Sequence, residues 1–502
     1  MKILLLALLI FINFSFSQQI SERSIQKGLD ALYNFEWEKS DNIFNKIIDD
    51  YPDEPVGYHY ASIKPLWLYL GSFNKAYLDT FFITSDKALS LAKKIEKEDS
   101  LFANLAFLLS SIYSNRSIAN ARDENYLYAV WESDRMKYYA DEALLLNEKL
   151  YDAHIGPGLY NLAVSQIPSS LQWAIKIVGI AGDRETGVEH LETVIKNGKL
   201  SRVDAKFYLS QIYSRIIIDN SYAEKLLRDL TNKYPRNLLF RMSLAWVELE
   251  EGNILSAEKK FRSIINIEQP EFPILKSLSN FQLGNINFFK GELDTAIFYY
   301  EKYLETKLRN DYEGITNLNA GIALELSGLR DSALVFYEQT AAGNLDLDED
   351  SFAKRKGQIL LEDSLSFEQK RLIFLTNLYK AGKYKSLIDS LKLFLSDSLN
   401  NDLKAEANLL LTKSYLKQKK YTKVIEHSAK TLDIEIKNEN WIHPYALYYG
   451  ALASYHLKNF TDSQLFLNLI SDYSDYDFSF KLEGLKYALQ QKLDKLKLTH
   501  SK

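Results

Sequence analysis

Apolar side chains recur every three to four residues through most of the chain, in segments separated by short polar turns. Residues at this spacing share one face of a helix, so the pattern predicts amphipathic helices that each bury one side. Only 20 glycines and 9 prolines occur in 502 residues, and so few helix breakers favour long helical runs. The 33 tyrosines and 27 phenylalanines supply large rings for the buried faces.

Several of these helices begin in the same way, with a turn, then a small or aliphatic residue, then an aromatic residue four positions later. In the segment 290–300, Gly291 stands in the turn, Ala296 at the small position and Tyr300 at the aromatic position. We use the small or aliphatic residue as an anchor, and the anchors are Gly187, Ala223, Ala257, Ala296, Ala333, Leu387, Val424 and Ser463. Their intervals are 36, 34, 39, 37, 54, 37 and 39 residues. Most of these intervals are close to the ~34-residue period of tetratricopeptide helix-turn-helix units. The chain therefore resembles a tetratricopeptide array.

A further unit is predicted near the start of the chain, where Gly28, Ser40, Phe44 and Pro52 have the spacing of the motif's glycine, small residue, aromatic residue and closing proline. The glycine is expected where the two helices of a unit cross closely. Each helix pair cannot bury its apolar face alone, so the pairs are expected to stack on one another.

The predicted fold class is all-α, a right-handed α-solenoid of tetratricopeptide helix-turn-helix repeats with a longer-helix N-terminal lobe. In that lobe the pattern predicts helices over Thr84–Lys97, Leu101–Ser117 and Glu124–Leu146, and a terminal helix is predicted over Phe478–Leu498. The predicted divisions are 1–17 signal peptide, 18–55 N-terminal unit, 56–181 long-helix lobe, 182–345 repeat array, 346–365 acidic linker loop, 366–475 second array, and 476–502 capping helix and tail.

The first residues indicate export. Met1-Lys2 is followed by an almost unbroken apolar run from Ile3 to Phe16, and the small residues Ser15 and Ser17 stand at the two positions that a signal peptidase reads. This pattern predicts a signal peptide cleaved after Ser17. A membrane anchor is disfavoured because the run is shorter than the roughly 20 residues needed to span a bilayer. With no cysteine, the chain has no thiol for a lipid anchor or a disulfide. We expect a periplasmic or cell-envelope-associated protein with no transmembrane segment after cleavage.

Charge and motifs narrow the chemistry. The net charge is −5 with no basic stripe, which argues against a nucleic-acid partner. None of the 7 histidines has a metal-ligand spacing, and the lack of cysteine excludes thiolate zinc sites. Phosphate-binding, dinucleotide-binding and nucleophile-elbow motifs are absent from the sequence. We therefore expect no metal, no cofactor and no enzymatic activity.

A second resemblance lies in the segments 156–168, GPGLYNLAVSQIP, and 179–191, GIAGDRETGVEHL. Residues 156–191 resemble the tetratricopeptide family that includes the yeast inclusion-body-clearance protein and its animal relatives. Ile180 stands where that family has an aromatic residue. The resemblance implies an adaptor-like role without known catalysis, although those relatives work in the eukaryotic cytosol. Asp183 is interpreted as a helix N-cap after a turn made by Gly179 and Gly182, in preference to a phosphate loop.

The concave groove of the solenoid is the expected binding surface for a protein or peptide partner. Counting from the anchors, the candidate groove residues are Tyr208, Arg215, Trp246, Asn285, Phe288 and Glu325. Tyr, Trp and Arg commonly anchor interfaces, but Trp246 and Phe288 are equally suited to packing between helices. The leading hypothesis is an exported scaffold for protein–protein interaction in the cell envelope. The alternatives are a binding component for envelope carbohydrate or another ligand, and an enzyme with a site in the 56–181 lobe.

Overall fold

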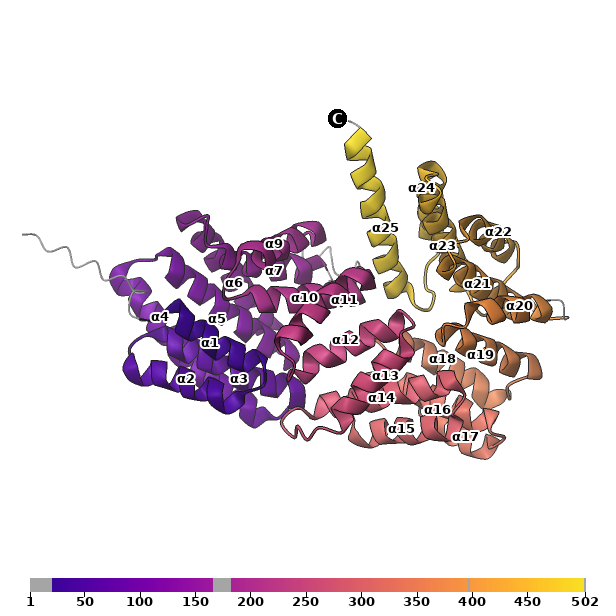
Figure 1. Ribbon diagram of the computed structural model, residues 1–502, viewed down its shortest axis with the longest axis horizontal. Helices are drawn as coiled ribbons and strands as arrows, with labels where there is room; N and C mark the ends of the chain where they lie inside the picture. The colour runs from indigo at the N-terminus through magenta and orange to yellow at the C-terminus, as the bar shows by residue number, and fades with distance from the viewer. Residues whose placement is uncertain (1–19, 166–181, 396–397, 501–502) are drawn as a thin grey trace, which may run out of the picture. The chain divides into compact units, whose positions relative to one another are not determined.

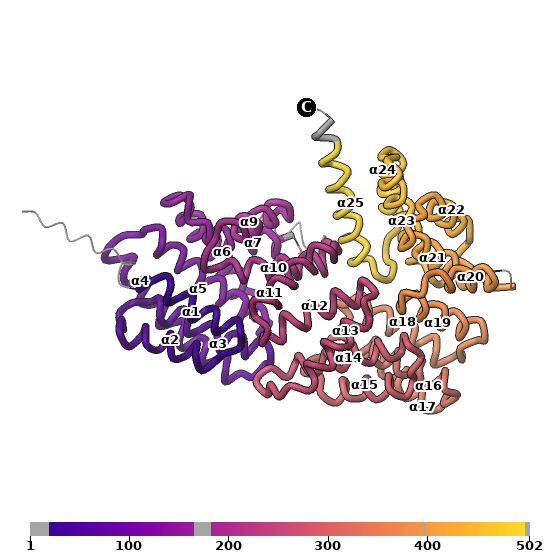
Figure 2. Tube along the Cα trace, viewed as in Figure 1, coloured from indigo at the N-terminus to yellow at the C-terminus, as the bar shows by residue number. Residues whose placement is uncertain are grey.

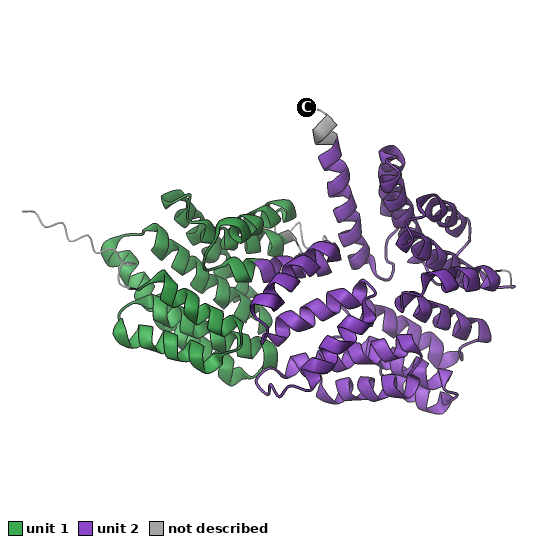
Figure 3. Cartoon of the chain, in the orientation of Figure 1, with its two compact units in different colours: residues 1–205 green, residues 206–502 purple. Residues whose placement is uncertain are grey.

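The computed structural model describes residues 20–165, 182–395 and 398–500. The predicted signal peptide 1–17 and the predicted turn residue Gly179 lie outside these residues. The chain divides into two compact units, 1–205 and 206–502 (Figure 3), and each is described by itself. Within the described residues, all regular secondary structure is helical, in agreement with the predicted fold class.

The first unit is built from pairs of helices in which consecutive members pack together, as the labels of Figure 1 allow the reader to follow. Its helices are α1 (Glu22–Tyr33), α2 (Trp37–Asp50), α3 (Pro55–Ser72), α4 (Lys75–Asp99), α5 (Ala103–Arg122), α6 (Tyr126–Leu146), the 3₁₀ turn η1 (Tyr151–His154), α7 (Ile155–Ser165) and α9 (Arg184–Asn197). Helix α10 (Arg202–Arg215) spans the division between the units.

The pair α1–α2 has the contacts that its spacing predicts. A Cβ atom on Gly28 would lie 2.4 Å from Cζ of Phe44, so only glycine lets the ring lie against α1. The Ser40 hydroxyl donates a hydrogen bond to the carbonyl oxygen of Gly28 at 3.2 Å. The glycine, the small residue and the aromatic residue thus fix one helix crossing between them.

Long helices follow, as predicted for the lobe. Helices α4, α5 and α6 have 25, 20 and 21 residues. Tyr113 of α5 and Tyr139 of α6 stack with ring centroids 5.7 Å apart in the core of this pair. The extra length gives each pair a larger interface than a short repeat helix offers.

The segment that carries the second resemblance forms the crossing of α7 and α9. A Cβ atom on Gly187 would lie 3.0 Å from the carbonyl oxygen of Gly158, so the two backbones meet at paired glycines. The predicted N-cap is confirmed, because the Asp183 carboxylate accepts a hydrogen bond from the backbone N–H of Thr186 at 2.7 Å. The glycines therefore have a packing role and Asp183 begins a helix.

The second unit continues the pairwise pattern along the path drawn in Figure 2. Its helices are α11 (Asn220–Lys233), α12 (Leu238–Glu250), α13 (Ile254–Ile265), α14 (Pro273–Lys290), α15 (Leu293–Thr306), α16 (Glu313–Leu326), α17 (Arg330–Glu338), the turn η3 (Thr340–Ala342), α18 (Asp348–Glu362), α19 (Phe367–Lys380), α20 (Tyr384–Phe394), α21 (Asn401–Lys417), α22 (Tyr421–Leu432), α23 (Ile442–His456), α24 (Phe460–Leu469), the turn η4 (Ile470–Asp472) and α25 (Ser479–His500).

The turn inside each repeat has a fixed geometry. Five residues before the anchors Ala257, Ala296, Ala333 and Leu387, the glycines of the turn have φ angles between 73° and 85°. This left-handed conformation strains any side chain with a Cβ atom. At the same place before Val424, Lys419 has φ 59°, so this repeat makes the turn without glycine.

The prediction of an acidic linker loop over 346–365 is wrong, because most of this segment forms helix α18. Its acidic residues stand in the first turn of the helix, where carboxylates are favoured by the helix dipole. The buried carboxylate of Asp350 also accepts hydrogen bonds from the backbone N–H groups of Ile315 and Asn344, each at 2.9 Å. This extra helix, packed on α16 and α17, accounts for the 54-residue interval in the repeat.

The predicted terminal helix is α25, and it does more than cover the last repeat. It contacts α23, α24 and α18, and the backbone N–H of Lys481 donates to Asp348 at 3.0 Å. A Cβ atom on Gly484 would lie 2.0 Å from the carbonyl oxygen of Ile216, in the turn after α10. Within this unit, the last helix therefore packs against the first turn.

No helix within the described residues combines the length and the apolarity needed to cross a bilayer.

Candidate functional site

Two of the six predicted groove residues are buried and serve the packing of the repeats. Phe288 lies in the core of α14, and its carbonyl oxygen accepts a hydrogen bond from Asn377 of α19 at 3.0 Å. The Glu325 carboxylate accepts hydrogen bonds from the Tyr337 hydroxyl at 2.9 Å and the backbone N–H of Leu365 at 2.6 Å. Neither side chain is free to meet a partner, so both are withdrawn as binding candidates.

A third candidate, Asn285, is half-buried between helices. Its side-chain oxygen accepts hydrogen bonds from the Tyr300 hydroxyl at 2.9 Å and from Asn319 of α16 at 3.3 Å. It joins α14, α15 and α16, which is a structural role.

The other three candidates lie nearer the surface. Arg215 is exposed and its guanidinium carbon lies 5.5 Å from the centre of the Trp246 ring. Trp246 is half-buried and packs on Tyr312, with ring centroids 5.6 Å apart. Tyr208 on α10 is half-buried as well. Arg215 and Trp246 thus come together, whereas the Tyr208 ring lies beside that of Phe207, with centroids 6.4 Å apart.

A cluster of polar and aromatic side chains in the second unit was not predicted. We call it the lysine–tyrosine cluster, and its residues are Glu250, Tyr379, Lys380, Lys413, Tyr449 and Lys481. They come from the first helices α12, α19, α21 and α23 and from α25. These helices are far apart in sequence, and folding of the unit brings their side chains together.

The repeat register contained the signal that identifies part of the cluster. Lys413 lies eleven residues before its anchor Val424, as Trp246 lies eleven residues before Ala257. The predicted groove residues Trp246 of α12 and Asn285 of α14 stand at this position, but the prediction did not include the residues at this position in the later repeats. A second register, seven residues before the anchors Ala257, Leu387 and Val424, holds Glu250, Lys380 and Lys417.

Two carboxylates partly balance the lysines at the end of α12. Lys481 Nζ lies 3.8 Å from a carboxylate oxygen of Glu250, and Lys417 Nζ lies 3.7 Å from one of Glu251. Both distances exceed a hydrogen bond, and all four side chains remain between one third and one half exposed. Lys481, then the other nearby lysines, lower the pKa of Glu250, which therefore stays ionised.

Lys380 and Lys413 have no carboxylate within salt-bridge distance among the described residues. Each ammonium instead faces an aromatic ring, Lys380 at 5.7 Å from the centre of Phe289 and Lys413 at 4.9 Å from that of Tyr379. Burial lowers the pKa of Lys380. Burial, together with the charges of Lys380 and Lys481, lowers the pKa of Lys413 to about 7.

Lys380 is exposed and Lys413 half-buried by their own surface, yet the surrounding protein disfavours their charge. The two observations agree if water reaches the groups while helices surround them on several sides.

Other charged groups form ion-pair networks within each unit. In the first unit, Arg116 binds buried Glu132 at 2.7 Å and Asp86 at 2.5 Å. In the second, Arg355 binds Asp477 and Glu439 beside a cavity of about 600 Å³. Within the described residues, no group of three or more His, Asp or Glu side chains is placed to hold a metal ion.

The stacked helix pairs, three of which have a glycine under an aromatic ring, define a fold of the tetratricopeptide helix-turn-helix type. Proteins of this class are scaffolds that bind other proteins, and they are generally not enzymes. Within the chain, residues 133–308 match the family model described as Iml2/Tetratricopeptide repeat protein 39. This match contains the segment 156–191 and confirms the resemblance drawn from its sequence.

Among solved structures, the comparison matches the yeast Tom70 (12% identity, TM-score 0.27, covering 94% of this chain and 96% of that chain). The Cut9-Hcn1 hetero-tetramer of APC/C has 14% identity and a TM-score of 0.27 over 94% and 97% of the two chains. The tetratricopeptide domain of P58(IPK) has 12% identity and a TM-score of 0.20 over 82% and 94%.

Proposed function

We propose that this protein is an exported scaffold that binds a protein partner in the cell envelope through the lysine–tyrosine cluster of its second unit. The observation that carries the proposal is the convergence of accessible lysines and tyrosines from the first helices α19, α21 and α23 and from α25, beside Glu250 of α12. First helices of stacked repeats present one continuous face, and such faces are the usual binding surfaces of solenoids.

Export is supported by the sequence of residues 1–17. A positive start, an apolar run and small residues before Gln18 are the features of a cleaved signal.

Cell fractionation combined with N-terminal sequencing tests export. The proposal expects the protein in the envelope or periplasmic fraction, with Gln18 as its first residue. A protein that stays in the cytoplasm with Met1 attached contradicts it.

Site-specific photocross-linking tests the binding surface. A photoreactive amino acid at Tyr379, in the cluster, is expected to cross-link a discrete partner in envelope preparations. The matched control is Leu393 on α20, which belongs to the same repeat but is 70% exposed on its second helix. Equal cross-linking from Leu393, or none from Tyr379, contradicts the assignment of the partner to the cluster.

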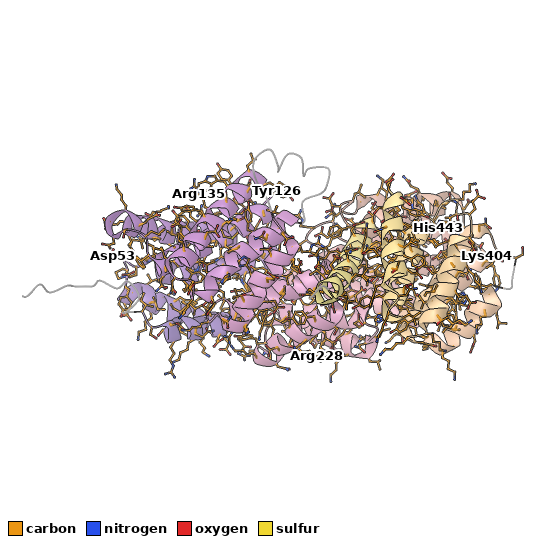
Figure 4. All side chains as sticks on the ribbon, turned by 90° about the horizontal axis from the view of Figure 1, so that it is seen from above. Asp53, Tyr126, Arg135, Arg228, Lys404 and His443 are labelled. Atoms are coloured by element: carbon orange, nitrogen blue, oxygen red, sulfur yellow. The ribbon has the colours of Figure 1, made fainter. Side chains whose placement is uncertain are left out.

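A second candidate function is the binding of envelope carbohydrate, and helix α6 is the observation that favours it. Tyr126, Tyr128, Trp131 and Tyr138 are each about half or more exposed there, and Tyr126 and Arg135 lie at the edge of the ribbon in Figure 4. Exposed aromatic rings offer apolar faces with polar tips that suit mixed surfaces. Retention on immobilised envelope polysaccharide that is lost on Trp131→Ala would support this role.

A further inference from the structure

A cavity of about 400 Å³ in the second unit lies between α11 and α13, the second helices of two neighbouring repeats, and the start of α12. These three helices pack consecutively and can be followed in Figure 1. The lining holds three basic side chains, Arg241, Lys259 and Lys260, and no acidic one. None of these residues belongs to the lysine–tyrosine cluster. The cavity is therefore a separate site, and its lining favours an anion.

Arg241 is half-buried in this lining and has no carboxylate within salt-bridge distance among the described residues. Its guanidinium donates to the carbonyl oxygen of Pro235 at 2.6 Å and to the hydroxyl of Ser263 at 3.2 Å. These two bonds hold the planar group in place and leave three of its five N–H groups without an acceptor in the described structure. Arg241 is thus a positioned cation whose charge the fold leaves unbalanced.

The pKa of this guanidinium reflects the same imbalance. Burial lowers the pKa of Arg241, and no opposing charge raises it. By contrast, the carboxylate of Glu224 raises the pKa of Arg228 on the neighbouring α11. A cation that is partly removed from water and lacks a counter-charge gains when an anion enters.

The carboxylate of Glu248, beside the cavity, is engaged by other cations. It is buried, and its two oxygens lie 2.8 Å from Arg228 and 2.7 Å from Lys260. The Lys260 ammonium also donates to the Ser256 hydroxyl at 2.8 Å. Glu248 therefore positions Lys260 at the cavity, and both of its oxygens are already used. The other two basic side chains of the lining gain no counter-charge from it.

We propose that this cavity binds the phosphoryl group of a phosphate monoester through Arg241, Lys259 and Lys260. Such a group carries nearly two negative charges at pH 7 and three oxygens that accept hydrogen bonds. The planar fork of an arginine and the compact charges of lysines suit these oxygens. The Ser256 hydroxyl accepts from Lys260 and so keeps its own hydrogen for a ligand oxygen.

The size of the cavity leaves space for the organic part of the ligand. Its volume of about 400 Å³ lies within the roughly 300–1,000 Å³ of small-molecule sites. A soluble sugar or polyol phosphate and the headgroup of a phosphatidate lipid present the same phosphoryl chemistry. The test therefore offers both forms.

The full chain is titrated with glycerol 3-phosphate by calorimetry at about pH 7.5. Glycerol, which lacks the phosphoryl group, and acetate, which has a single charge, are the comparators. Phosphatidylcholine vesicles with and without phosphatidate offer the group as a lipid headgroup. The variant is R241Q/K259Q, and the control K385Q/K392Q removes two exposed lysines of α20 with the same change in charge.

The proposal expects glycerol 3-phosphate to bind the native protein and K385Q/K392Q alike, and to bind R241Q/K259Q roughly tenfold or more weakly. Retention on phosphatidate vesicles that is lost in R241Q/K259Q assigns the site to a lipid headgroup. Binding of glycerol 3-phosphate without such retention assigns it to a soluble ligand. Either result supports the shared phosphoryl chemistry.

The proposal is overturned if the native protein binds neither form, or if glycerol or acetate binds as tightly as glycerol 3-phosphate. Unchanged binding by R241Q/K259Q overturns it too, and so does an equal loss in K385Q/K392Q, because binding would then follow net charge alone. Thermal unfolding without ligand shows whether R241Q/K259Q is folded. If it is not, K259Q alone decides, because Lys259 is exposed: about threefold weaker binding supports the proposal, and unchanged binding overturns it.

Discussion

The ring of Tyr300 covers Gly284 so closely that a Cβ atom on this glycine would lie 2.4 Å from Cδ1 of the ring. The same relationship joins Gly321 with Tyr337, where the distance would be 2.5 Å, and the members of each pair are sixteen residues apart. Helices α14 and α15 can therefore cross only if position 284 has no side chain.

Gly284→Ala is expected to destabilise the second unit by about 1–3 kcal/mol, because an added methyl group forces the buried ring to move. Thermal unfolding of the full chain and hydrogen exchange of α14 and α15 measure this effect. Tyr300→Phe keeps the ring and loses only the hydrogen bond to Asn285, so its cost should be smaller, about 1 kcal/mol. An unchanged melting temperature for Gly284→Ala would show that the crossing is not tight.

Lys419 makes a turn that other repeats make with glycine, at φ 59°. Lys419→Gly should stabilise the protein by about 0.5–1 kcal/mol, because relief of the left-handed strain exceeds the entropy lost by a more flexible residue. The reverse change, Gly291→Ala at φ 80°, should cost about 1 kcal/mol. Denaturation of the two variants side by side checks the signs, and a destabilising Lys419→Gly would be inconsistent with the strain.

Gly484 of α25 meets the carbonyl oxygen of Ile216. Gly484→Leu is expected to detach α25 from the turn after α10 and to speed hydrogen exchange along α25, while the repeats keep their protection. Leu493→Ala, in the same helix but buried in the core near α23, should lower protection in both regions. If α25 exchanges at the native rate in Gly484→Leu, its contact with this turn does not hold the helix.

The two histidines at the junction of η1 and α9 form a pH-sensitive contact in the first unit. His154 Nδ1 and His190 Nδ1 lie 2.7 Å apart, and one ring must donate to the other. Burial lowers the pKa of both rings, with the charge of His190 adding to the effect on His154. Asp141 and Glu189 act in the opposite direction on His190, and Lys137 adds to the lowering.

Because both folded pKa values lie below the unfolded value of 6.5, the unfolded chain binds more protons as the pH falls. The stability that depends on the neutral rings is present above about pH 6.5 and decreases below it. The melting temperature should fall between about pH 7 and pH 5, and less steeply in His154→Gln/His190→Gln. If the melting temperature falls equally with pH in the native protein and in this variant, the acid sensitivity belongs to other groups, such as buried His59.

The repeat, the long helices of the lobe, the N-cap at Asp183 and the terminal helix could be predicted because they follow from local spacing. The structure of residues 346–365 could not be predicted, because acidic residues suit both a solvated loop and the first turn of a helix. The choice depends on Asp350 meeting the backbone of α16, which is a tertiary contact.

The candidate site was predicted in part. Lys413 lies eleven residues before its anchor, as Trp246 does, so this residue of the cluster could have been predicted from the sequence. Glu325 was selected by the same kind of count, but its burial depends on Tyr337 and on the backbone of Leu365. The position of Lys481 depends on how α25 returns across the unit, and no local pattern encodes that path.

The central claim is that a partner occupies the lysine–tyrosine cluster, and the reactivity of Lys413 toward an amine-acylating reagent tests it most directly. With a pKa of about 7, Lys413 is largely neutral at pH 8 and should be labelled faster than exposed Lys385 or Lys404 in the purified protein. In intact envelope preparations, the account predicts that Lys413 and Lys380 are protected while Lys385 and Lys404 react at unchanged rates. Equal labelling of Lys413 in both preparations would contradict the account.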